Sequence, residues 1–360
     1  MGRPACKRAP TGLQRGSYRH RYSRAYSGVS MRLLIAPLAA LLFLTTCTPM
    51  AGDGGGAIAG GPIASVDGDA PAGRADDAVQ SEPLPAASPA EEAERPAAAL
   101  PAVLTLPDQG PPVAPGDSAA LAEILVAAEH AIRGPEHGPE VLGAAGHWQQ
   151  VVYRRLAEEP ERVEAVLAEM PAALHDVVRR NVYADARLLA MSTPVDPNRQ
   201  ARIRDLPPWR IVAPPPADEL RAYYEEAEAA TGVHWSYLAA INLVETRMGR
   251  ISGVSSAGAQ GPMQFMPATW AEWGQGDVHD HRDAIMAAGR YLRWGGMPGD
   301  VNGALFRYNR DMRYVDAIRT YAEQMQADPR AYYGYYHWQV YFNTRADNVW
   351  LAPGYEGSPR

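Results

Sequence analysis

Cysteine and lysine are nearly absent from this sequence of 360 residues. It has two cysteines, Cys6 and Cys47, and a single lysine, Lys7. Both cysteines precede every segment whose pattern indicates a folded domain. A structural disulfide and a cysteine-based metal site are therefore excluded from the folded part of the chain.

Basic residues are scarce beyond the N-terminal segment. Residues 1–47 carry eight Lys and Arg and no Asp or Glu, which leaves 26 basic against 41 acidic residues, a net charge of −15, for the rest of the chain. Nucleic-acid-binding domains carry a basic footprint, and the acidic remainder lacks one. We therefore expect no nucleic-acid partner.

Long apolar runs are also missing, apart from residues 33–44, LLIAPLAALLFL. A membrane-spanning helix needs roughly 20 apolar residues, so this run, which follows Arg32, predicts an export signal. Cys47 stands where a bacterial lipoprotein carries its lipidated cysteine, although Thr46 occupies a position that usually holds Gly, Ala or Ser. We predict an exported, cell-envelope protein with Cys47 as lipidation site and sole contact with the membrane; a plain cleaved signal over residues 1–47 is the alternative.

Residues 48–117 form a tract of Ala, Pro, Gly and acidic residues, with eleven acids and two bases. Such a composition buries too little apolar surface to offset chain entropy. The tract is predicted to be a disordered spacer.

Helical periodicity begins after the spacer. Leu121, Ile124, Leu125 and Ala128 fall on one helical stripe, and the pattern predicts a small bundle of three or four helices over residues 118–192. Its histidines lack paired ligand spacing, so no metal is expected; they are His130, His137, His147 and His175. Residues 193–217 are a Pro-rich connector, which predicts that the parts on either side fold separately.

The segment 218–326 is again mainly α. Asp218 is a suitable N-cap for its first helix, and Asp280, with Asp283 three residues on, predicts another helix start. The aromatic extension 327–360 is expected to pack on this part, with sugar binding as the lesser alternative, and VYFNT within it could form a strand. The expected helices are 218–230, 234–248, 267–273, 281–294, 300–307 and 311–327.

One carboxylate in this segment is out of place. Glu245 follows Leu238 and Ile241 by seven and four residues, so it lies on the apolar stripe of its helix. It also lies near the helix C-terminus, where the macrodipole disfavours negative charge. Both effects raise a carboxyl pKa, as a general acid for glycosidic cleavage requires. The alternative is a structural ion pair with Arg247 or Arg250.

The surrounding motifs resemble those of the lytic transglycosylases of bacterial cell walls. In that family a helix ends in Glu-Ser or Glu-Thr, a serine follows in a loop, and Gly-x-x-Gly-x-Met-Gln-x-Met-Pro and Ala-Tyr-Asn come later. Arg310 and Asp311 depart from the small residues that usually follow Ala-Tyr-Asn. The resemblance covers residues 218–326 and is carried by Glu245-Thr246, Ser255, Gly258, Gly261, Met263, Gln264, Met266, Pro267 and Tyr308-Asn309.

The resemblance implies a lysozyme-like catalytic domain acting on peptidoglycan glycan strands without a cofactor. Glu245 would serve as the only general acid and base, giving a 1,6-anhydro product. The cleft residues that it implies for substrate binding are Ser255, Gln264, Met266, Tyr308 and Asn309, and the glycines at 258 and 261 would let the backbone approach the glycan. Two alternatives stay open: a muramidase-type hydrolase, for which Glu272 and Asp277 are the nearest further acids, and a non-catalytic wall-binding protein.

Overall fold

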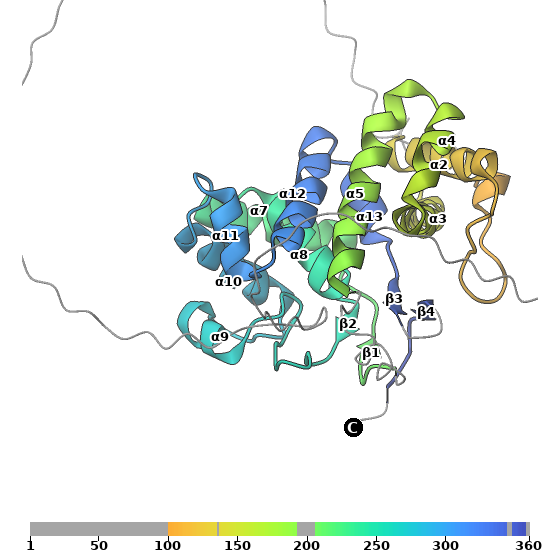
Figure 1. Cartoon of the computed structure of the whole chain (residues 1–360). Coiled ribbons are helices and arrows are strands. Elements are labelled where there is room, and N and C mark those ends of the chain that lie inside the picture. The colour runs from red at the N-terminus through yellow and green to blue at the C-terminus, as the bar shows by residue number, and fades with distance from the viewer. Residues whose placement is uncertain (1–99, 135–136, 193–205, 344–347, 358–360) are drawn as a thin grey trace, which may run out of the picture. The chain divides into compact units, whose positions relative to one another are not determined.

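The computed structural model describes residues 100–134, 137–192, 206–343 and 348–357 (Figure 1). The predicted export signal with Cys47, most of the predicted spacer and most of the connector lie outside the described residues. Within the described part of the chain, none of the helices combines the length and the apolar character that a membrane span requires. The mainly α fold class is confirmed.

The expected bundle over residues 118–192 consists of four α-helices and two short 3-10 turns. Asp117 caps the first helix, because its carboxylate accepts a hydrogen bond from the amide of Ala120 at 3.0 Å. The elements are α2 (Ser118–Arg133), α3 (Pro139–Glu158), η2 (Pro160–Arg162), α4 (Val163–Ala168), η3 (Ala172–Leu174) and α5 (His175–Ser192).

The spacer boundary predicted at residue 117 lies too far along the chain. Residues 100–117 include a 3-10 turn, η1 (Ala102–Leu104), whose Leu104 is fully buried. The indole nitrogen of Trp148 donates to the carbonyl of Thr105 at 3.3 Å. The composition of the whole tract of seventy residues does not reveal the short apolar segment around Leu104, because the polar and small residues dominate the average.

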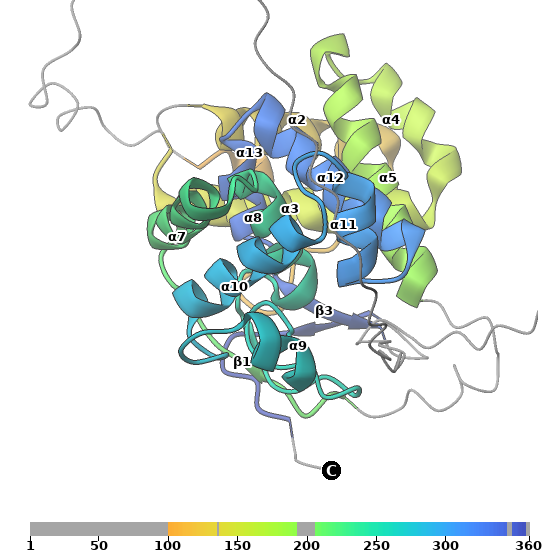
Figure 2. The ribbon, with the colours of Figure 1, turned by 90° about the vertical axis from the view of Figure 1, so that its left-hand side faces the viewer.

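The helices of the second part lie close to the expected ranges. Asp280 caps α10 as predicted, since its side chain accepts from the amide of Asp283 at 2.9 Å. Asp218 does not cap this helix as predicted, because the helix begins at Ala217, one residue earlier. The carboxylate of Asp218 instead accepts a hydrogen bond from the hydroxyl of Tyr333 at 2.8 Å. The helices are α7 (Ala217–Thr231), α8 (Trp235–Thr246), α9 (Pro267–Trp273), α10 (His281–Trp294), α11 (Val301–Tyr308) and α12 (Met312–Ala327). In Figure 2, α8 lies among α7, α10 and α12.

Two short antiparallel pairs complete the structure. Strand β1 (Arg210–Ile211) pairs with β2 (Ile251–Ser252), shortly after the end of α8. Strand β3 (Val340–Asn343), which confirms the expected strand, pairs with β4 (Asn348–Leu351). The following segment then returns to β1, where the amide of Ile211 donates to the carbonyl of Tyr355 at 2.9 Å.

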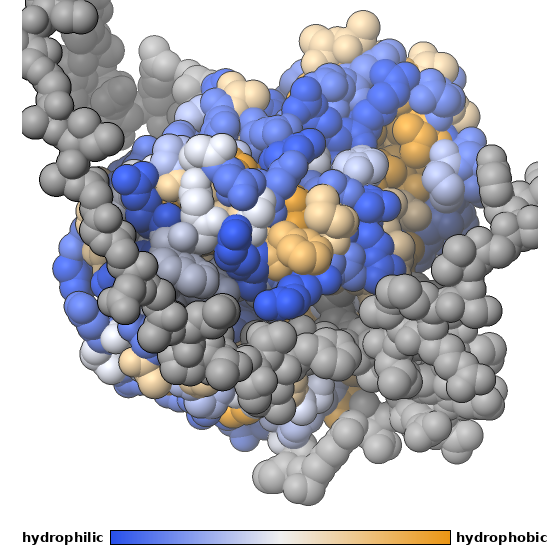
Figure 3. Space-filling model, turned by 60° about the vertical axis from the view of Figure 1, so that its left-hand side comes forward, coloured by the Kyte–Doolittle hydropathy of each residue, from blue (hydrophilic) through white to orange (hydrophobic). Residues whose placement is uncertain are grey.

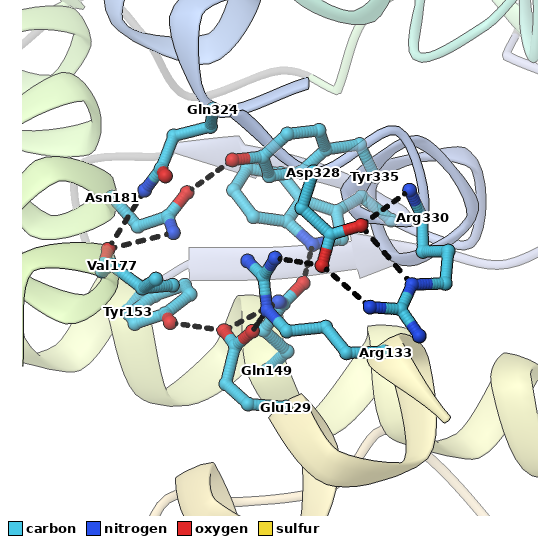
Figure 4. A network of polar contacts seen from close by, with 11 residues as sticks. Glu129, Arg133, Gln149, Tyr153, Val177, Asn181, Gln324, Asp328, Arg330 and Tyr335 are labelled. Atoms are coloured by element: carbon cyan, nitrogen blue, oxygen red, sulfur yellow. Dashed lines mark hydrogen bonds and ion pairs between the residues drawn. The ribbon is translucent and has the colours of Figure 1, made fainter. Parts of the chain in front are cut away.

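The two helical parts share one hydrophobic core, contrary to the separate folding that the connector predicts. Helix α5 packs along α12, and a polar network crosses the boundary (Figure 4). Its centre is the fully buried Glu129, whose carboxylate accepts from Gln149 at 2.8 Å and from the hydroxyl of Tyr153. Arg133 bonds to Glu129 at 2.9 Å and to Asp328, just beyond α12, at 2.8 Å. Separation of the two parts would break the partly buried ion pair between Arg133 and Asp328.

The aromatic segment after α12 is a packing layer. It forms α13 (Ala331–Tyr336) and runs on to β3. Tyr332, Tyr335 and Trp338 are at most 1% exposed. The hydroxyl of Tyr335 donates to Asn181 of α5 at 2.6 Å, and the ring of Tyr332 packs edge-on against Trp235 of α8. These rings are closed to a sugar, so the sugar-binding alternative fails for them.

Candidate active site

Helix α8 places Glu245 one residue before its end. The helix stops because the next residues take left-handed backbone conformations, with φ of 55° at Arg247 and 61° at Met248. Such conformations cost about 1–3 kcal/mol each for non-glycine residues and persist where surrounding contacts fix them. Here Met248 is fully buried, and the guanidinium of Arg247 donates back to the carbonyl of Leu243 at 2.7 Å. The chain therefore turns sharply just after the carboxyl.

Glu245 is half-buried, and its partner is a tyrosine from α12. The hydroxyl of Tyr314 donates to Oε1 of Glu245 at 2.8 Å. Burial raises the pKa of Glu245 from 4.5 to about 7, and the hydrogen bond from Tyr314 opposes part of this increase. The carboxyl can therefore hold a proton near neutral pH and also release it.

The ion-pair alternative for Glu245 is not what the structure shows. Among the described residues, no salt bridge includes Glu245. The guanidinium of Arg250 donates to the carbonyl of Arg247 at 3.2 Å and lies 5.1 Å from the ring centre of Tyr336. Both arginines that could have paired with Glu245 are used for backbone and ring contacts.

The loop after β2 is attached to α8 by buried polar side chains. Thr246 Oγ1 donates to the carbonyl of Pro262 at 2.6 Å, and the amide nitrogen of Asn242 donates to the same oxygen at 2.9 Å. Asn242 is held in turn by the hydroxyl of Tyr224, 2.6 Å from its side-chain oxygen. The loop that carries the Met-Gln motif is thus fixed to the same helix as Glu245.

Within this loop, Ser255 and the glycines shape the backbone. Ser255 Oγ accepts from the amide of Ala259 at 2.9 Å, and the two residues also share a backbone hydrogen bond of 2.9 Å. Gly261 has a φ of 73°, and a Cβ there would lie 1.9 Å from the carbonyl oxygen of Val278. The close approach at Gly261 is therefore to the protein's own backbone. Gly258 has open space around it, because a Cβ there would meet nothing within 4 Å.

Gln264 adopts a left-handed conformation with a φ of 52°, and its side-chain nitrogen donates to the carbonyl of Gly261 at 2.9 Å. Gln260 and Phe265 close a tight turn around it through two backbone hydrogen bonds of 2.8 Å. Met266 follows as the half-buried N-cap residue of α9. The polar side chain of Gln264 is thus set in a strained, rigid turn.

Tyr308 ends α11 and joins the loop to the carboxyl. Its hydroxyl donates to the carbonyl of Met263 at 2.7 Å, and its ring stacks on that of Tyr314 with centres 6.4 Å apart. Burial, and then the charge of Glu245, raise the pKa of Tyr308 well above its ordinary value, so it stays a donor. Asn309 is the half-buried C-cap residue of α11, and the departure at Asp311 serves as N-cap of α12.

The two further acids lie apart from these contacts. Glu272 is exposed on α9, and Asp277 is exposed in the next loop, where its carboxylate accepts from the amide of His279 at 2.9 Å. Neither contributes to the pKa of Glu245. The described residues therefore provide one perturbed carboxyl at this site, not a pair.

Three residues of the site are not predicted by the sequence: Tyr314, Asn242 and Tyr224. Tyr314 lies 69 residues after Glu245, and nothing in the local pattern connects them. A polar Asn242 in the apolar run of α8 is a usable signal, because a buried amide requires partners.

Comparisons with known proteins agree on this region. Residues 222–326 match the family model of the transglycosylase SLT domain. Over 122 residues, 32% of this chain, the sequence is 27% identical to membrane-bound lytic murein transglycosylase F of Thiobacillus denitrificans. The aligned part spans 26% of that relative's length. No solved structure matches the chain.

Proposed function

We propose that this chain is a peptidoglycan lytic transglycosylase, because its residues 222–326 match the transglycosylase SLT domain. In this proposal it cleaves the β-1,4 bond between N-acetylmuramoyl and N-acetylglucosaminyl residues, with Glu245 as the only general acid and base. One observation carries the proposal: Glu245 is half-buried, bonded to Tyr314, and has a pKa of about 7.

The first step is proton donation. Protonated Glu245 gives its proton to the glycosidic oxygen as the bond from that oxygen to the anomeric carbon breaks. Tyr314 holds Oε1 and so fixes the rotation of the carboxyl. The acetamido oxygen of the substrate's own muramoyl residue stabilises the anomeric centre, so no second protein carboxylate is required.

The second step closes the anhydro ring. Glu245, now a carboxylate, removes the proton of the C6 hydroxyl, whose oxygen bonds to the anomeric carbon. The proton that Glu245 lost in the first step is thereby regained, and no water is consumed. A carboxyl with a pKa near 7 is suited to both transfers, because neither of its forms is strongly disfavoured near neutral pH.

The proposal assigns substrate binding to residues of the loop after β2 and of the end of α11, and these two segments are attached to α8 and to each other. Gln264 and Tyr308 would hydrogen-bond the acetamido sugar, and Met266 would provide apolar wall. Ser255 and Asn309 would border the cleft. The attachment of the loop to α8 through Thr246 supports this assignment, because catalysis requires groups held in fixed positions.

Digestion of purified sacculi, followed by mass spectrometry of the muropeptides, tests the reaction. Wild-type protein should release products lighter by one water than those of a hydrolase. Glu245→Gln should lose activity by ~10²–10⁴-fold or more, while Glu272→Gln and Asp277→Asn stay within a few-fold of wild type. Hydrated products, or equal loss in Asp277→Asn, would replace the proposal with a two-carboxylate hydrolase. Binding without cleavage by the wild type would indicate a wall-binding protein.

We also propose a cell-envelope location with Cys47 as lipid anchor, consistent with the membrane-bound relative. Cys47→Ser should then move the protein from the membrane fraction to the soluble fraction. An unchanged membrane fraction would leave a plain export signal.

A further inference from the structure

A cluster of aromatic rings extends from the candidate active site to the surface at the ends of α9 and α10. The ring of Tyr308 contacts that of Tyr291, with centres 5.7 Å apart, and Tyr291 stacks on Trp294 at 5.7 Å. Trp273 lies 5.2 Å from Trp294. Trp294 is 58% exposed, so the cluster ends in an indole that is open to solvent.

A hollow of about 430 Å³ lies beside this indole. It is shallow and wide open to solvent, so a ligand bound there would keep one side exposed. Figure 3 shows the side of the molecule toward which α7, α9 and α10 lie in Figure 1; its surface is mainly hydrophilic, with hydrophobic residues near its centre. The lining residues are Ala230, Thr231, Trp273, Arg290, Arg293 and Trp294.

Two arginines give the hollow a positive charge, and no acidic side chain among the described residues forms an ion pair with either of them. Arg290 Nε donates to the carbonyl of Trp273 at 2.9 Å, and Arg293 Nη1 donates to the carbonyl of Met297 at 3.3 Å. These partners are neutral, and neither guanidinium forms a salt bridge with a described residue, although Asp283 acts on Arg290 at longer range. In addition, Nη2 of Arg290 is buried and has no hydrogen-bond partner among the described residues.

The exposed indole of Trp294 and the two guanidiniums without an ionic partner among the described residues together select a particular kind of ligand. An aromatic face packs against the apolar face of a pyranose ring. A guanidinium fork matches a carboxylate and favours it over a neutral group. A neutral sugar would use only the first of these features.

We propose that the hollow binds a carboxylate-bearing sugar of the glycan strand, with the pyranose on Trp294 and the carboxylate on Arg290 and Arg293. The choice of a glycan sugar as the ligand rests on the proposed function. The ring contacts through Tyr291 and Tyr308 hold this second docking point at a fixed position relative to Glu245. The hollow thus engages substrate at a place remote from the bond that is cut.

Fluorine NMR of the full chain labelled with 5-fluorotryptophan tests the proposal. The Glu245→Gln background prevents turnover, and loss of one signal in Trp294→Phe assigns the resonance of Trp294. N-acetylmuramic acid, whose lactyl carboxylate is free, is the acidic probe, and N-acetylglucosamine, which lacks the lactyl group, is the neutral one. The acidic probe should shift the resonances of Trp294 and Trp273 at millimolar concentrations, and the neutral probe should need a higher concentration.

Charge removal gives the decisive comparison. Arg293→Gln, at an exposed position, should weaken binding of the acidic probe about tenfold, as expected for loss of a charge-assisted hydrogen bond, and should leave the neutral probe unaffected. Arg290→Gln should act in the same way. The matched control is Arg319→Gln, an exposed arginine of α12, which should change neither.

Absence of a Trp294 shift, or equal binding of the two probes, would overturn the inference. So would unchanged acidic binding in both arginine variants. The proposed function fails separately: if sacculi are not cleaved while Trp294 still responds, the reaction is wrong and the docking site remains. Anhydro products with a silent Trp294 would reject the docking site alone.

Discussion

Glu245 should lower the stability of the folded protein at neutral and alkaline pH, and Glu245→Gln should remove this effect. Burial raises the pKa of the folded carboxyl to about 7 from 4.5. Between these values the folded state binds more protons than the unfolded state, so the free energy of unfolding falls as pH rises. Above about pH 7 both states have released the proton and the loss is complete.

The size of the effect follows from that interval. At roughly 1.36 kcal/mol per pH unit, the wild type should lose about 3 kcal/mol relative to Glu245→Gln between about pH 4.5 and pH 7. Glutamine cannot ionise and keeps an oxygen that accepts from Tyr314, so the contacts of the site are largely preserved. A loss of this size would be a large fraction of the stability of an ordinary domain.

Urea unfolding of both proteins from about pH 4 to pH 8.5 measures the difference by linear extrapolation. The two stabilities should converge at the acidic end and separate with rising pH. Glu272→Gln, at an exposed position of α9, is the matched control and should run parallel to wild type. A constant difference between wild type and Glu245→Gln across the whole range would refute the assignment of a raised pKa to this carboxyl.

Three further predictions concern the support of the site and its domain. Tyr314→Phe removes the contact that lowers the pKa of Glu245, so the alkaline limb of kcat/KM should move up by about one pH unit; a limb that stays or moves down contradicts this. Gly261→Ala should lose far more stability and activity than Gly258→Ala, because its Cβ would lie 1.9 Å from a carbonyl oxygen; equal thermal unfolding midpoints would argue against that packing. A fragment of residues 206–360 should show no cooperative unfolding transition, because it exposes the face of α12 that α5 covers, and a sharp calorimetric transition would count against a shared core.

The sequence predicts most of the helices of the second part and singles out Glu245, because both depend on local patterns. Helical periodicity and capping residues act over a few positions, as at Asp280. The same periodicity places Glu245 on the apolar stripe. Its raised pKa, about 7, has the predicted direction, with burial as the main cause.

The features that the sequence does not predict depend on contacts between distant segments. Tyr314 meets Glu245 across 69 residues, and Tyr335 meets Asn181 across 154. A Pro-rich connector indicates a break in secondary structure, but it carries no information on whether the helices on either side pack together. For this reason the connector predicts separate folding, although α5 and α12 share a core.

The return of the segment after β4 to β1 affects the order in which the site can be completed during synthesis. Strand β2 follows α8 closely and pairs with β1, which in turn pairs with Glu356 and bonds to Tyr355. At elongation rates of roughly 5–20 residues per second, Tyr355 is made about 5–20 s after Glu245. Until then β1, which pairs with the strand that follows α8, lacks its last partner, so a nascent chain has a period in which the candidate active site is present in sequence but not yet in its final form.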